Sequence, residues 1–146
     1  MTGEPVRVAG VGMTKFGKSS DRTGRELFAE ASRKALEDAG VSTDDVEELF
    51  FGNFMSEFAE LQGHQGPMAA AAAGITAPSV RVDSACASSG VAVRQGITRL
   101  RAGDADVVLV GGSERMTNLS TADATEALAA AADAMWEVRA GVTFPG

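Results

Sequence analysis

Short apolar runs alternate with longer amphipathic or alanine-rich stretches along this 146-residue chain. Four runs rich in valine, leucine or phenylalanine predict buried strands, at 6–13, 46–54, 80–83 and 106–110. Apolar residues at helical spacing predict helices at 25–39, 68–73, 90–101 and 121–139. Gly40 and Gly103 follow two of these helices, where a left-handed residue commonly ends a helix. This alternation indicates an α/β domain whose parallel or mostly parallel sheet is covered on both faces.

Three of the predicted strands end in residues that suit a functional site. The second strand ends in the turn Gly52-Asn53, the third is followed by Cys86, and the fourth runs into the sequence Gly-Gly-Ser-Glu at 111–114. In doubly wound sheets, functional groups collect beyond the carboxyl ends of the strands. We therefore predict that these three strand ends converge on one site.

Cys86 is the only cysteine, and it stands where a predicted strand turns into a helix. Amide hydrogens of a first helical turn lack intrahelical partners and the helix dipole is positive there, so both favour a thiolate. The neighbouring alanines, serines and glycine allow a substrate to approach closely. Cys86 is therefore a candidate nucleophile; the alternative is a small buried thiol that packs as a hydrophobic side chain.

Composition narrows the class of protein. One cysteine excludes an intramolecular disulfide and a cysteine zinc cluster, and we expect no metal site. The chain start lacks a basic region, and no apolar stretch near it is long enough for a signal peptide or a membrane span, so we expect a cytoplasmic protein. The formal net charge of −7 argues against nucleic acid as a partner and gives no general attraction for an anionic substrate.

Two motifs at a fixed separation, 84–90 around the cysteine and 106–116 around Gly-Gly-Ser-Glu, closely resemble the thiolases. The opening segment 11–17 and the Gly52-Asn53 turn are similar too, most of all to the sterol-carrier-protein-type and archaeal acetyl-CoA acetyltransferase branch. The resemblance implies two similar α/β halves, each with a five-stranded mixed sheet between helices. This chain would supply the thiolase-like N-terminal half, with the second half absent. We expect the N-terminal α/β domain at 1–120 and the truncated start of a loop region at 121–146.

The resemblance also implies a function, an acyl-CoA acyltransferase that performs Claisen condensation or thiolysis through a thioester on Cys86. The N–H of Cys86 would contribute to an oxyanion hole. Coenzyme A enters as the thioester substrate, no other cofactor is expected, and no residue is assigned to binding it. Thiolases resemble one another in a dimer formed across the strand that runs here from Val80 to Asp83.

The residues that complete the thiolase site come from the C-terminal half of the family, and this chain has no second cysteine. Its only histidine, His64, lies outside any matching motif, so we expect a surface or loop histidine and not the activating base. The isolated chain should therefore acylate slowly at most and not turn over efficiently. Asp83 is a carboxylate close to Cys86 that would oppose formation of the thiolate.

Two other functions stay open. The chain could be a non-catalytic thiolase-like fragment or subunit that serves assembly with a partner chain, because the catalytic half is missing. A partner chain could instead supply the C-terminal half; without it the apolar faces of 68–73 and 91–100 would be exposed, and we expect aggregation or a tight oligomer. A ketoacyl-synthase-like condensing enzyme shares the nucleophile position, but Glu114 after Gly-Gly-Ser favours a thiolase. We expect Glu114 to bond backbone near the Gly-Gly turn. Trp136 is expected either to cover the site or to anchor the loop region by packing.

Overall fold

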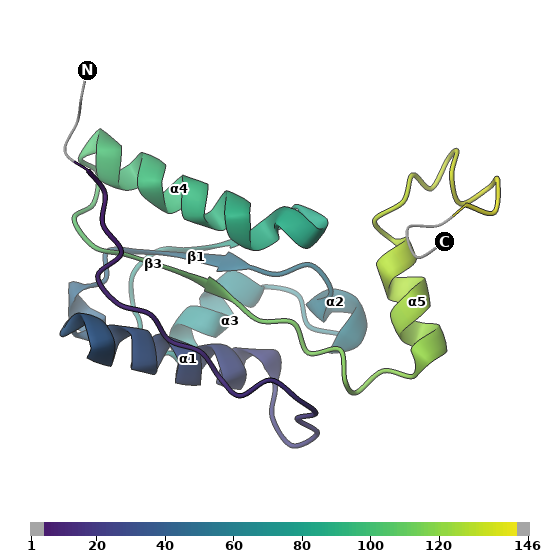
Figure 1. Ribbon diagram of the computed structural model, residues 1–146, viewed down its shortest axis with the longest axis horizontal. Coiled ribbons are helices and arrows are strands. Elements are labelled where there is room, and N and C mark those ends of the chain that lie inside the picture. The colour runs from purple at the N-terminus through teal and green to yellow at the C-terminus, as the bar shows by residue number, and fades with distance from the viewer. Residues whose placement is uncertain (1–4, 143–146) are drawn as a thin grey trace.

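The computed structural model describes residues 5–142, in which helices and strands alternate (Figure 1). Residues 1–4, at the start of the predicted 1–120 domain, and residues 143–146, at the end of the predicted 121–146 segment, lie outside the described residues. The elements in chain order are α1 (Gly24–Ala39), the 3₁₀ turn η1 (Thr43–Asp45), β1 (Glu48–Gly52), α2 (Ser56–Ala59), α3 (Gln65–Ala72), β2 (Ser79–Val82), the 3₁₀ turn η2 (Ala85–Ala87), α4 (Ser88–Ala102), β3 (Val108–Gly112) and α5 (Thr121–Ala129).

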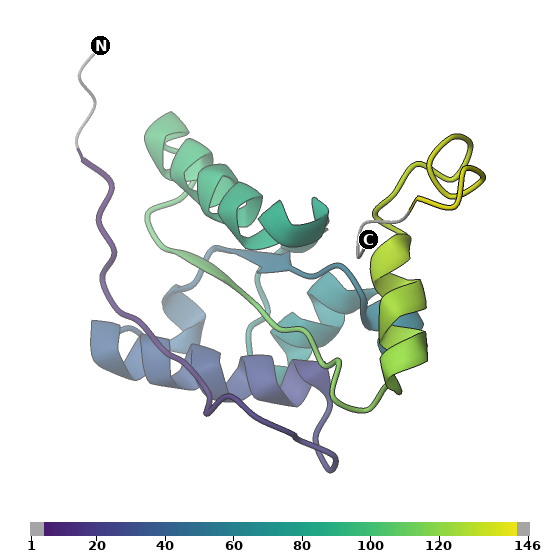
Figure 2. The same cartoon turned by 45° about the vertical axis from the view of Figure 1, so that its right-hand side comes forward.

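The three strands form a parallel sheet in the order β2-β1-β3, which confirms the predicted α/β class and its parallel sheet. Phe50 in the central strand is in register with Val80 on one side and Val110 on the other. Helix α4 covers one face of the sheet, and α1 and α3 cover the other (Figures 1 and 2). The connections from β1 to β2 and from β2 to β3 run in opposite directions, so the strand order reverses beside β1.

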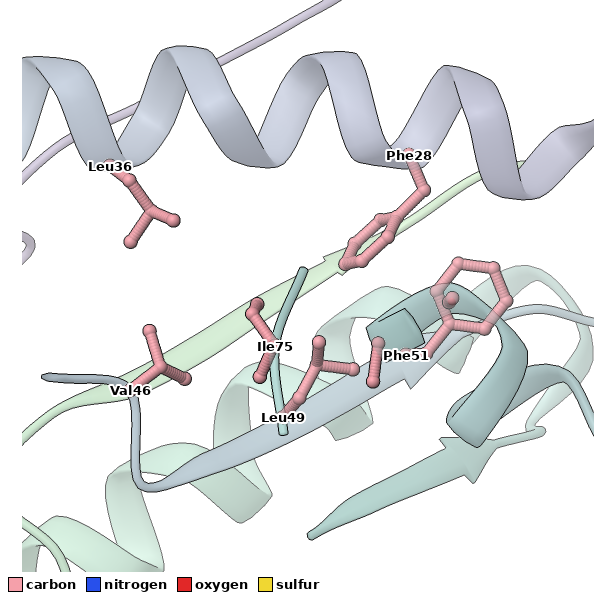
Figure 3. Close-up of a cluster of buried hydrophobic side chains, with 8 residues drawn as sticks. Phe28, Leu36, Val46, Leu49, Phe51 and Ile75 are labelled. Carbon is pink, nitrogen blue, oxygen red and sulfur yellow. The ribbon is translucent and has the colours of Figure 1, made fainter. Parts of the chain in front are cut away.

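The main hydrophobic core fills the space between α1, α3 and the sheet (Figure 3). Phe28 of α1 meets Phe51 of β1 edge-to-face, with ring centroids 5.0 Å apart and planes at 81°. Leu49 and Phe51 are the largest fully buried side chains. Burial of each stabilises the fold by about 1.5–3 kcal/mol relative to an exposed position. The sheet is thus fixed to α1 by large apolar side chains of its central strand.

The ends of the predicted helices follow local rules. Thr23 caps α1 in a capping box, in which its hydroxyl accepts from the Glu26 N–H and the Glu26 carboxylate accepts from the Thr23 N–H. Gly40 and Gly103 adopt the left-handed conformation after α1 and α4, as predicted.

The predicted strand at 6–13 is wrong. This segment is extended but unpaired, and it runs along the outside of α1 (Figure 2). A Cβ at Gly10 or Gly12 would overlap backbone atoms of α1, so these glycines allow a direct backbone contact with the helix that takes the place of strand pairing. The five-stranded mixed sheet is not confirmed either, because residues 5–142 contain three strands and all are parallel.

The predicted helix at 121–139 stops at Ala129 and gives way to turns. The Asp133 carboxylate accepts hydrogen bonds from the N–H groups of Met135 and Trp136, at 2.8 and 2.9 Å, and so offers the backbone an alternative to a helix. Trp136 is 78% exposed, so the expectation of a packed anchor is wrong. The domain division at 120 stays a prediction. Within the described range, every helix is too short or too polar to cross a bilayer.

Candidate active site

The carboxyl ends of β1 and β3 and the Cys86 turn line one cavity of about 770 Å³. Gly52, Cys86, Gly112 and Glu114 all contribute to its wall, together with residues 12–19 of the N-terminal segment. The cavity lies where the strand order reverses, which is the usual position of a ligand crevice in an open parallel sheet. The predicted convergence of the three strand ends is therefore confirmed.

Cys86 lies in η2, directly before α4, and its side chain is exposed. The alternative of a buried, packed thiol is therefore wrong. A closed set of bonds shapes the turn, because Ser84 N–H donates to Ser88 Oγ (2.9 Å) and Ser88 Oγ–H donates to the Ala85 carbonyl (2.7 Å). Ala85 has a φ of +48°, a left-handed conformation that costs an alanine free energy. Strain of this kind, one residue before an exposed thiol, is typical of a turn that presents a functional group.

Two glycines allow the strands and α4 to meet at this point. A Cβ on Gly112 would overlap the carbonyl oxygen of Gly52 on the neighbouring strand. A Cβ on Gly52 would lie 3.0 Å from the backbone nitrogen of Ser89, in the first turn of α4. Because a side chain at Gly112 would overlap β1 and one at Gly52 would crowd the Ser89 backbone, these glycines allow the helix start to approach the sheet closely beside Cys86.

Glu114 bonds backbone, as predicted, but it does so across the sheet. Its carboxylate accepts hydrogen bonds from the N–H groups of Phe54 and Met55, which follow β1. Partial loss of water contact raises the pKa of Glu114, and the two N–H bonds and the positive charge of Arg81 act in the opposite direction, while the negative charge of Asp83 adds to the rise. Glu114 therefore ties the β3 end to the β1 end while it lines the cavity.

Sequence reasoning missed the roles of Asn53 and Arg81. The Asn53 side chain is 2% exposed, and its Nδ2 donates to the Ser113 carbonyl at 2.8 Å. Arg81 extends from β2 to oxygen atoms beyond the end of β1. The available signal was an arginine between Val80 and Val82, because a charged residue in a strand of a covered sheet requires partners.

The only histidine lies away from the cavity, whereas several side chains of the N-terminal segment line it. His64 is an exposed residue with a φ of +59° before α3, away from the cavity lining, as expected for a loop histidine. Met55 is a buried core residue, whereas Met13 is 65% exposed and lines the cavity. Lys15 and Lys18 also line the cavity, on the side of the N-terminal segment. Residues 5–142 contain no cluster of three or more side chains suited to hold a metal ion.

Comparison with known proteins agrees with this geometry. The sequence matches the family model of the thiolase N-terminal domain over residues 6–144. Acetyl-CoA acetyltransferases of Methanocaldococcus jannaschii and Methanothermobacter thermautotrophicus are each 43% identical over 141 residues, 96% of this chain and 36% of the relative. A β-ketothiolase of Cupriavidus necator is 37% identical over 122 residues, 80% of this chain and 31% of the relative. The chain thus spans about a third of the length of these relatives. The predicted resemblance is confirmed, and this chain belongs to the thiolase family as a thiolase N-terminal domain.

Proposed function

We propose that this chain is the nucleophile-bearing part of a thiolase-type acyl-CoA acyltransferase, with Cys86 as the residue that takes the acyl group. One observation carries the proposal: Cys86 is exposed in a strained turn, at the start of a helix and on the wall of the strand-end cavity. The names of the relatives, acetyl-CoA acetyltransferase and β-ketothiolase, support acetyl-CoA as the substrate class.

The proposed step is a transthioesterification. Cys86 Sγ, as thiolate, attacks the carbonyl carbon of acyl-CoA and forms a new carbon–sulfur bond. The bond between that carbon and the coenzyme A sulfur breaks, and coenzyme A leaves as a thiolate that takes up the proton released from Cys86. No oxygen within residues 5–142 accepts a hydrogen bond from the Cys86 N–H, so this N–H is available to bind the carbonyl oxygen during the attack.

The cavity supplies positive charge that the chain as a whole lacks. Lys15, Lys18 and Arg22 line it, whereas the chain carries a formal net charge of −7. Arg22 is paired with Glu30 at 2.7 Å, and the Glu114 carboxylate also lines the cavity, so the three cationic and two acidic side chains of the lining leave a small positive excess. Local cations of this kind attract the phosphates of coenzyme A.

We further propose that a second polypeptide segment completes the site. The chain offers no histidine at the cavity and no second cysteine, so the base for the α-proton is expected from residues outside this chain.

An assembly role is the second candidate function. It is favoured by the free outer edge of β2 within the described sheet and by half-exposed Val80 and Val93, and a homodimer paired through β2 fits that edge.

The test is the intact mass of the 146-residue chain after incubation with acetyl-CoA, beside Cys86→Ala and Cys86→Ser. One acetyl group on the wild type and none on either variant would support the nucleophile. An adduct that persists in Cys86→Ala would contradict it. No adduct on a wild-type chain that is folded by circular dichroism would favour the assembly role for this chain alone.

A further inference from the structure

Arg81 connects the ends of two strands behind the Cys86 turn. Its side chain is only 18% exposed. Nε donates to the Asn53 carbonyl at 3.1 Å, and one terminal nitrogen donates to the Phe54 carbonyl at 3.0 Å. The guanidinium also pairs with the carboxylates of Glu57 and Asp83, the latter at 3.3 Å. One side chain from β2 thereby holds the residues that follow β1 and a residue of its own strand end.

The Asp83 carboxylate connects Arg81 to the turn that carries Cys86. Its second oxygen accepts a hydrogen bond from the Ala85 N–H at 3.1 Å. Ala85 is the residue with the left-handed φ of +48°, and Cys86 is its covalent neighbour. An unfavourable conformation persists only where its surroundings impose it. The Ser84–Ser88 bonds restrain one side of Ala85, and Asp83 restrains its N–H.

We propose that Arg81 is a positioning residue for Cys86: by fixing Asp83, it holds Ala85 in its strained conformation and so sets the direction of the Cys86 side chain. The proposal rests on the proposed function in one respect, because it treats Cys86 as the acyl acceptor. Arg81 is absent from the residues that line the cavity, so it acts through Asp83 and not on the substrate.

Arginine suits this place better than lysine. Its planar guanidinium presents five N–H donors, enough to reach two carbonyls and two carboxylates together. A lysine ammonium is a single point of charge on a flexible stem. Arg81→Lys is therefore expected to keep the attraction for Asp83 and to lose the bonds to the carbonyls of Asn53 and Phe54. That variant separates the effect on the turn from the effect on stability.

The test is amide hydrogen exchange in the 146-residue chain, followed by NMR. We expect Arg81→Met to speed exchange of the Ala85 amide by about tenfold, since its acceptor becomes free to move. The Ser84 amide is the internal control, because it bonds Ser88 and not Asp83. Arg81→Lys should keep Ala85 exchange within about threefold of the wild type while it lowers the unfolding midpoint. Arg81→Gln replaces Arg81→Met if the latter does not fold.

Arg99→Met is the matched control. Arg99 of α4 bonds Glu48 at 2.6 Å and Asp104 at 2.8 Å, so like Arg81 it pairs with two carboxylates, but at the opposite end of the sheet. We expect it to leave Ala85 exchange unchanged. In an Asp83→Asn background, Arg81→Met should change Ala85 exchange by less than about twofold. Arg81 is proposed to act on Ala85 through Asp83, so the effects of the two substitutions should not add.

Three results would overturn the proposal: unchanged Ala85 exchange in Arg81→Met, equal acceleration at Ser84 and Ala85, or independent effects of Arg81→Met and Asp83→Asn. A second readout addresses the reaction. Acetyl transfer to Cys86 should fall about fivefold or more in Arg81→Met, whereas alkylation by iodoacetamide, which needs less orientation, should stay within about twofold. If wild-type Cys86 takes no acetyl group, the proposed function fails, while Ala85 exchange still decides whether Arg81 holds the turn.

Discussion

The side-chain amide of Asn53 donates a hydrogen bond of 2.8 Å to the backbone carbonyl of Ser113, and so joins the ends of β1 and β3 beneath the cavity. The same side chain accepts hydrogen bonds from the hydroxyl and the N–H of Ser56 through its oxygen. Both ends of the amide are thus occupied in a site that is nearly closed to water.

Asn53→Asp should lower the free energy of unfolding by about 1–3 kcal/mol, because a carboxylate cannot donate to the Ser113 carbonyl and leaves a buried charge. Asn53→Ala should lower the free energy of unfolding by a similar amount, since it also leaves the Ser56 hydroxyl without its acceptor. Urea unfolding followed by circular dichroism measures both. Asn118→Ala is the control, because exposed Asn118 makes a single side-chain bond to the Ala59 carbonyl. An equal cost for all three variants would contradict a special role of Asn53.

Gly112→Ala should be strongly destabilising, by about 2 kcal/mol or more, because the added methyl group overlaps the Gly52 carbonyl oxygen and must push β3 from β1. Gly90→Ala is the matched change. Gly90 lies in α4 with no atom within 4 Å of an added Cβ, so alanine should stabilise that helix by about 0.5–1 kcal/mol. Thermal melts of the two variants should therefore shift in opposite directions.

Acid should weaken the fold partly through Glu26. Hydrogen bonds from the Thr23 N–H and hydroxyl hold the pKa of Glu26 below its usual value. The unfolded chain then binds the proton more tightly, so this contribution is present above the usual glutamate pKa of about 4 and is lost as the pH falls through the lowered value. Glu26→Gln should flatten the acid side of the stability–pH curve, whereas Glu126→Gln, an exposed change in α5, should not.

Glu114 should change the pH dependence of stability in the opposite direction to Glu26. Its pKa is raised by partial loss of water, so the folded chain binds this proton more tightly than the unfolded chain. The contribution is complete below the usual glutamate pKa and is lost as the pH rises through the raised value. Glu114→Gln should remove this decline with rising pH, although it also weakens the bonds to Phe54 and Met55. A decline of unchanged slope in the variant would show that another group causes it.

Phe51→Ala should lower the free energy of unfolding by about 3–5 kcal/mol, because it removes a fully buried ring from the contact with Phe28. Phe16→Ala removes the same ring from a position that is 84% exposed and should change stability by less than about 0.5 kcal/mol. Chemical unfolding of both variants gives the comparison.

The periodic elements were predictable because local forces decide them. Helix α1 has an apolar stripe, a capping box and a terminal glycine, and these three signals agree. The segment at 6–13 has an apolar run like that of a strand, but its glycines contact α1, and that contact depends on a helix more than ten residues away. No local sequence pattern distinguishes an apolar run that pairs as a strand from one that packs against a helix.

Some features of the candidate site could likewise be predicted from the sequence, and others could not. The position of Cys86 at a helix start and the convergence of strand ends follow from the order of elements. The contacts of Asn53 and Arg81 do not, because they join residues on separate strands through side chains whose partners are set by sheet register. A buried polar residue shows from sequence that a partner is required, but not which oxygen it is.

The position of the N-terminal segment has a consequence for truncation. All sheet pairing described here lies between residues 48 and 112, whereas residues 12–19 border the cavity without joining the sheet. A chain that began near Ser20 would still contain every residue of the paired strands, of the central ring pair and of the strained turn. It would lose one side of the enclosure around the thiol, including both lysines. The enclosure of the thiol and the pairing of the sheet therefore draw on different parts of the chain.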